Sequence, residues 1–236
     1  MEHEKFDFKY PHDSLGLIRW KYKSKMETLL DVDLNFTNYL LENIRTMDYD
    51  IDEQIEYMED SDYDDEFHIA LYEDFEKRFM TIKVDHHNIM KNSVFLQMYF
   101  TFEDTLFQYC KVLQAVSENK IKLKDLNGQG IEKYKNYLSK VFNLELVFSS
   151  NDWSLITCFN QIRNVLVHNG GIISEQNSER FNKSINRSGQ QIYSSKDDQI
   201  IINDNWEIMK IFNSFFDRLN EAVAKSNILD NSRKVL

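Results

Sequence analysis

Arg163, Asn164 and His168 are three side chains that can act together on a phosphodiester, and they lie within six residues. Arg offers a permanently charged fork that matches the geometry of a phosphate. His can accept or donate a proton near neutral pH, and Asn can orient a neighbouring group without adding charge. RNA carries its own nucleophile in the 2′-hydroxyl group. These residues therefore suit metal-independent RNA cleavage, in which a base activates the 2′-oxygen, an acid protonates the 5′-oxygen and Arg stabilises the phosphorane.

A helix expected over residues 151–168 must position this group, because the three residues fall in its last turns. Gly170 and Gly171 follow after Asn169, where a helix end accepts a left-handed residue. On an ideal helix Asn164 and His168 share a face, whereas Arg163 and His168 point about 140° apart. Arg163 and His168 can therefore converge on one phosphate in two ways. Either the helix end distorts, or a second copy in a symmetric dimer supplies the missing group.

The pattern Arg163-Asn164-x-x-x-His168 at the end of an apolar helix resembles the signature of the HEPN superfamily. Its members are α-helical, usually dimeric, and frequently metal-independent RNases of toxin–antitoxin, abortive-infection and CRISPR-linked systems. The resemblance implies a homodimeric endoribonuclease, a toxin or antiphage effector, that acts on RNA. It implies no metal and no other cofactor, and it leaves room for an antitoxin or another regulatory protein as partner.

The resemblance extends to the helix expected over residues 88–117, which carries Glu103 as the family's first core helix often carries an acidic residue. Glu103 is either a surface carboxylate or the partner that holds Arg163 in place. Asn169, directly after the histidine, is a further supporting candidate. HEPN toxins paired with nucleotidyltransferase antitoxins usually have Tyr two positions after the His. This chain has Gly170 there, so regulation through modification of that tyrosine is not expected.

Other interpretations of these residues stay open. Arg163 could be a surface ion-pair partner, and His168 could be favoured at a helix C-terminus by the macrodipole. A non-catalytic HEPN-like module that binds RNA or a protein would use the same residues structurally. A third hypothesis is an interaction protein whose acidic segment is the working part. The sequence Asp85-His86-His87 suggests metal ligands, but no distal ligand is indicated, and a solvated helix start explains it as well.

The charge of the chain is uneven along its length. The 236 residues carry a net charge of −11, yet 14 of the 39 acidic residues lie in residues 48–76, which contain no Lys or Arg. The remainder carries 25 acidic and 28 basic residues, so net charge does not argue against an RNA partner. The N-terminus lacks the apolar stretch of a signal peptide, and no apolar run approaches the length of a membrane span. A cytoplasmic protein that does not enter a membrane is expected.

The scarcity of chain breakers, with one Pro and six Gly, predicts a mainly α-helical fold: a HEPN-like helical bundle with a small β-hairpin near the C-terminus. We expect three regions. They are an N-terminal helical extension over residues 1–85 with the acidic segment 48–76, a HEPN-like domain over 86–229, and a frayed tail over 230–236. Within them, helices are expected to end near Val84 and to restart at residue 88. Loops are expected at 60–65 and 174–191.

Overall fold

The computed structural model describes residues 11–59, 65–117, 119–174, 192–196, 199–226 and 228. The prediction of a mainly α-helical fold with a small β-hairpin is confirmed. The expected tail at 230–236, and nearly all of the expected loop at 174–191, lie outside the described residues. So do residues 60–64 of the expected acidic loop, whereas residue 65 already begins a helix.

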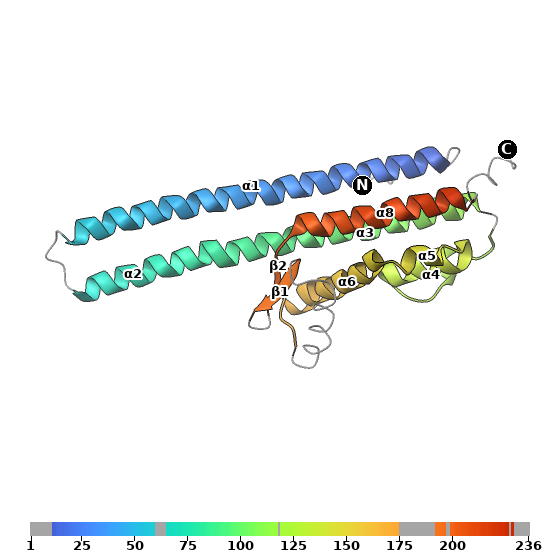
Figure 1. Ribbon diagram of the computed structural model, residues 1–236. Helices are drawn as coiled ribbons and strands as arrows, with labels where there is room; N and C mark the ends of the chain where they lie inside the picture. The colour runs from blue at the N-terminus through green and yellow to red at the C-terminus, as the bar shows by residue number, and fades with distance from the viewer. Residues whose placement is uncertain are drawn as a thin grey trace.

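Two long antiparallel helical runs dominate the molecule (Figure 1). The first is α1 (Pro11–Glu59), which begins at a proline, a residue well suited to the first turn of a helix. The second joins α2 (Asp65–Met80), the π-helical η1 (Thr81–His86) and α3 (His87–Val116). The residues that flank η1 keep right-handed helical dihedral angles. The expected break between Val84 and residue 88 is therefore wrong, because the wider π-helical turns continue the helix.

The core lies where α3 is surrounded by the other helices. Helix α8 (Asn205–Lys225) packs along α3 with α1 on one side, and α6 (Asn151–Asn169) and α4 (Gly130–Phe142) lie on the other (Figure 1). Aromatic side chains fill the contact between α3 and α8. The ring of Phe102 stacks on that of Phe212 with centroids 4.5 Å apart. Twelve of the thirty residues of α3 are buried, as expected for a central helix.

Short elements complete the bundle. The 3₁₀ turn η2 (Leu123–Asp125) and the four-residue helix α5 (Glu145–Phe148) flank α4. The antiparallel hairpin of β1 (Tyr193–Lys196) and β2 (Gln199–Ile202) precedes α8. Ile200 and Ile202 are buried, so β2 fixes the hairpin on the core.

The far end of the two long runs is thinner than the rest. Between Leu40 and Val94, none of the side chains whose exposure the structure describes is buried. We call this part the arm: residues 41–59 of α1 with residues 65–93 of the second run. It carries the acidic segment and extends beyond the end of α8 (Figure 1). The predicted boundary at residue 85 falls within η1, inside the arm.

Candidate active site

The end of α6 is a regular helix terminus. The Ser150 hydroxyl accepts a hydrogen bond from the backbone N–H of Trp153 (3.3 Å) and so caps the beginning of the helix. At the other end Gly170 adopts a left-handed conformation with φ of 60°. The backbone N–H groups of Gly170 and Gly171 are both directed to the carbonyl of Val165. The helix is thus stopped by its glycines without distortion of the turn that carries the histidine.

Arg163 is held against the body of the protein. Its side chain is half-buried, and the guanidinium carbon lies 5.2 Å from the centroid of the Phe100 ring. Its Nη1 donates a hydrogen bond to Oδ1 of Asn164 at 2.9 Å. Its Nε is buried and has no hydrogen-bond partner among the described residues. The ring below and the amide beside it orient a guanidinium that still has a buried donor to satisfy.

Glu103 on α3 is half-buried and interacts with this arginine at longer range. Burial raises the pKa of its carboxyl group, and the positive charge of Arg163 acts in the opposite direction. Both side chains are described, yet they form no direct ion pair. Glu103 is therefore neither a free surface carboxylate nor a bonded partner of the arginine. It contributes a negative potential near the guanidinium.

The backbone of α4 approaches this carboxylate closely. A Cβ atom placed on Gly130, the first residue of α4, would lie 2.9 Å from Oε1 of Glu103. A side chain at this position would force the carboxylate of Glu103 to shift, and the φ of +55° favours glycine there. Beneath it the buried Tyr99 donates a hydrogen bond from its hydroxyl to Oδ1 of Asn160 at 2.8 Å. Burial, followed by the charge of Glu103, raises the pKa of the Tyr99 hydroxyl, so this group acts as a neutral donor.

His168 and Asn169 occupy the open part of the site. Both side chains are exposed, and no hydrogen bond or ion pair joins the His168 side chain to another described residue. Because α6 is regular as far as Asn169, Asn164 and His168 share a face while Arg163 points about 140° away from His168. Within one chain the structure thus joins Arg163 to Asn164 and leaves the histidine apart. Distortion of the helix end, the first of the two ways to bring Arg163 and His168 together, does not occur in this structure.

The alternative metal ligands lie elsewhere. Asp85 and His86 are exposed on η1, in the middle of a helical run and not at a helix start. His87 is half-buried, and burial with the nearby charge of Lys91 lowers the pKa of its imidazole. Among the described residues, no three His, Cys, Asp or Glu side chains lie close enough together to bind a metal ion.

Sequence reasoning missed four residues of the site around Arg163 and Glu103: Tyr99, Phe100, Gly130 and Asn160. Their helices cross in space, and no spacing within one sequence pairs a residue of α3 with one of α6. The one available signal is that Tyr99, Phe100 and Glu103 fall within about one turn of each other on the same helix.

Comparisons with protein-family models, with curated proteins and with solved structures find no match to this chain. In the part of the chain that the structure describes, no helix combines the length and the apolar character needed to cross a membrane.

Proposed function

We propose that this chain is a metal-independent endoribonuclease in which two copies combine their Arg163 and His168 at one phosphate. The observation that carries the proposal is a half-buried guanidinium, oriented by Asn164 and Phe100, on the same helix end as an exposed histidine. In the proposed reaction a histidine removes the proton of the RNA 2′-hydroxyl, and the 2′-oxygen attacks phosphorus. The bond to the 5′-oxygen breaks, an acid protonates that oxygen, and a 2′,3′-cyclic phosphate remains. Arg163 offsets the extra negative charge of the phosphorane.

The surface around the motif supports a second copy as the source of the missing group. Phe100, Val167 and Ile172 are 37%, 44% and 60% exposed, which gives this face apolar side chains that a partner can cover. A symmetric dimer about this face would set the histidine of one copy opposite the arginine of the other. As a biological role we propose a toxin or antiphage effector, and this part rests on the HEPN resemblance alone. The same holds for an antitoxin partner.

Cleavage of RNA in the presence of EDTA tests the chemistry. We expect His168→Ala and Arg163→Ala to lose about 10²-fold or more in rate, as is typical for removal of an acid–base group or a charge stabiliser. His86→Ala is the matched control, because it removes another exposed histidine on a different element. RNA with a 2′-deoxy residue at the cleaved position should resist the enzyme. If His168→Ala and Arg163→Ala fold and cut like wild type, the chain is instead a non-catalytic RNA- or protein-binding module.

Mixing the two inactive variants tests the shared site. Random association places half of the molecules in mixed dimers. In a mixed dimer, one of the two shared sites holds both an intact Arg163 and an intact His168, so about a quarter of the wild-type activity should return. If each site were built from one chain, no mixed dimer would hold an intact site. A mixture without activity would therefore refute the shared site even where the enzyme itself is active.

A further inference from the structure

The loop between α3 and α4 presents lysines from a fixed backbone. In residues 119–125, which we call the lysine loop, every second residue is bonded or buried. The Asn119 amide donates to the carbonyl of Val141 (3.3 Å), and the hydroxyl of Tyr137 donates to the carbonyl of Ile121 (3.4 Å). The next two odd-numbered residues, 123 and 125, complete the anchoring. The even-numbered positions carry the exposed residues Lys120, Lys122 and Lys124.

The anchoring at residues 123 and 125 also engages the carboxylate of Asp125 with the backbone of the loop. Leu123 is buried, and its N–H donates to Oε1 of Gln114 at 2.8 Å. The carboxylate of Asp125 accepts the N–H of Lys122 at 2.8 Å, so it closes the backbone turn. No ion pair joins the three lysine side chains of the loop to any other described residue. The ammonium groups are therefore available to an anionic partner.

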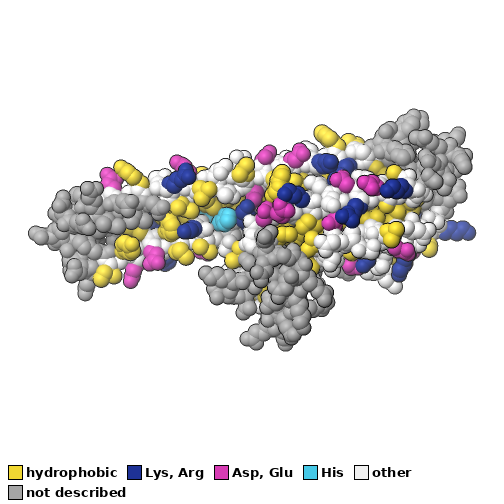
Figure 2. Space-filling model, viewed as in Figure 1, with side chains coloured by type: hydrophobic (Ala, Val, Ile, Leu, Met, Phe, Trp, Pro, Cys, Tyr) yellow, Lys and Arg dark blue, Asp and Glu magenta, His cyan; other side chains and the backbone are white. Residues whose placement is uncertain are grey.

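The surrounding surface extends the positive charge. Residues 111–140 contain seven Lys and three acidic residues. Lys111 and Lys140 are exposed as well. In the view of Figure 2, most of the described Lys and Arg side chains lie over the half of the molecule that holds α4, α5 and α8, with Asp and Glu side chains among them. This charge is far from the acidic segment, because α1 is 49 residues long and an α-helix rises about 1.5 Å per residue. The acidic segment of the same chain therefore lies some tens of ångströms from the lysine loop.

The lysine loop is also connected to the candidate active site. It leads directly into α4, whose first residue, Gly130, approaches the carboxylate of Glu103. Tyr134 of α4 packs on Phe107 of α3, with ring centroids 5.7 Å apart, so the start of α4 is fixed on the helix that carries Glu103 and Phe100. A strand bound at Arg163 can thus continue across the start of α4 to the lysines.

We propose that the lysine loop binds the sugar–phosphate backbone of the RNA strand whose scissile phosphate lies at Arg163. The inference rests on the proposed function for the identity of the polymer. Lysines are point charges that contact phosphates without reading the sequence, so they add affinity and position the strand while the motif acts on it.

Binding of a short fluorescent 2′-O-methyl oligoribonucleotide, followed by anisotropy over a range of salt concentrations, tests the inference. This probe lacks the 2′-nucleophile, so binding is measured without cleavage. Each phosphate contact on a single strand contributes about 0.7 to the slope of log K against log salt. Replacing three lysines should therefore reduce the slope by about 2. The loop variant combines Lys120→Ala, Lys122→Ala and Lys124→Ala, and the corresponding Lys→Arg triple should keep the wild-type slope.

A matched control exists on α1. Lys21, Lys23 and Lys25 have the same spacing and are exposed, but on a helix residues two apart point about 200° apart. The α1 variant, with these three lysines changed to Ala, has the same net charge as the loop variant and should keep the wild-type slope. Equal slopes for the loop and α1 variants would overturn the inference, as would failure of the wild-type chain to bind the probe at low salt.

The outcomes also separate this inference from the proposed function. If the wild-type chain binds the probe through the lysine loop but cuts no RNA, the proposed activity is refuted and the binding surface stands. If the chain cuts RNA while the loop and α1 variants bind the probe alike, only the proposed binding surface is refuted. If the loop variant dissociates a homodimer and leaves probe binding unchanged, the lysines hold the acidic segment of a second copy, and the inference is overturned.

Discussion

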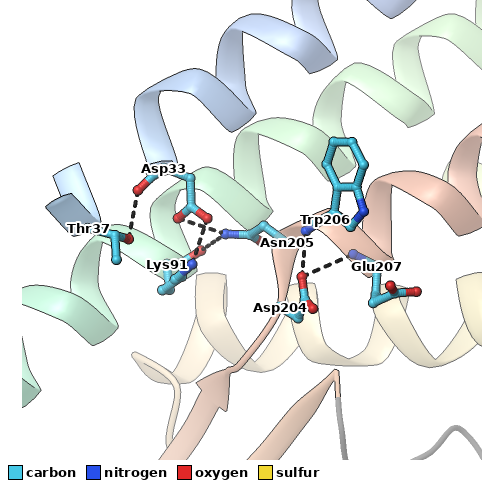
Figure 3. A network of polar contacts seen from close by, with 7 residues as sticks. All are labelled: Asp33, Thr37, Lys91, Asp204, Asn205, Trp206 and Glu207. Carbon is cyan, nitrogen blue, oxygen red and sulfur yellow. Dashed lines mark hydrogen bonds and ion pairs between the residues drawn. The ribbon is translucent and has the colours of Figure 1, made fainter. Parts of the chain in front are cut away.

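Asp33, Lys91 and Asn205 form a buried polar network that ties the base of the arm to the bundle (Figure 3). Nζ of Lys91 lies 2.6 Å from Oδ2 of Asp33, and the two side chains are 13% and 9% exposed. The amide of the fully buried Asn205 donates to Oδ1 of Asp33 (3.3 Å) and to the carbonyl of Lys91 (3.2 Å). The network therefore joins α1, α3 and the first residue of α8. We predict that Asp33→Asn and Lys91→Met each strongly destabilise the protein.

The expected magnitude follows from burial. Removing one member of a buried ion pair costs about 3–5 kcal/mol, because the other charge is left without its partner. Since both Asp33 and Lys91 retain slight exposure, we take the lower end, about 3 kcal/mol for each single variant. For a chain of this length that corresponds to a fall in Tm of roughly 6–12 °C. The double variant removes both charges, so its loss should be smaller than the sum of the two single losses.

Urea unfolding at pH 7, followed by tryptophan fluorescence, measures the free energy of unfolding of the bundle in wild type and in the three variants, because Trp20, Trp153 and Trp206 all lie outside the arm. The difference between the double variant and the sum of the singles gives the coupling energy. We expect about 2 kcal/mol or more, with little dependence on salt, because a buried pair is poorly screened. Single losses below about 1 kcal/mol that simply add in the double variant are the mark of an exposed pair and would refute this reasoning.

Two further predictions concern the candidate active site. Glu103→Gln should raise Tm at pH 7, because burial raises the pKa of this carboxyl group and so disfavours its ionised form in the folded state. The gain in Tm should disappear in melts below about pH 4, where the wild-type carboxyl group is protonated in both the folded and the unfolded state. Gly170→Ala and Gly130→Ala should each cost about 1–2 kcal/mol in urea unfolding, since both positions have positive φ. Only at Gly130 would the new methyl group displace Glu103, so only Gly130→Ala should also change the rate of RNA cleavage. Equal cleavage rates for the two glycine variants would contradict this placement of Glu103.

Local patterns predicted the parts of the site that depend on one helix. The apolar spacing before Arg163 and the two glycines after His168 were enough to place the motif at a helix end with a left-handed cap. The contact between Arg163 and Phe100 could not be predicted, because it depends on how α6 crosses α3. The same is true of Asp33 and Lys91, which are 58 residues apart and show no local pattern that pairs them.

The continuous second run shows why a helix boundary was misplaced. Phe67, Leu71, Phe75 and Phe79 recur every four residues, and a different stripe begins at Val94. A change in the phase of an apolar stripe is the usual sign of a break between helices. Here η1 lies between the two stripes, and its π-helical turns shift the phase without ending the helix.

The lack of buried side chains in the described part of the arm has a consequence for local unfolding of the protein. Helices that share no buried side chains with a third element gain little from tertiary packing, and isolated helices are only marginally stable in water. Because the side chains described between Leu40 and Val94 are all at least partly exposed, the arm should melt as a cooperative unit of its own, below the free energy that unfolds the bundle. The network of Asp33, Lys91 and Asn205 spans that limit, because Lys91 belongs to the arm whereas Asp33 and Asn205 belong to the bundle. We expect local unfolding of the arm to stop at this network, before it reaches α6 and the part of α3 that contacts Arg163.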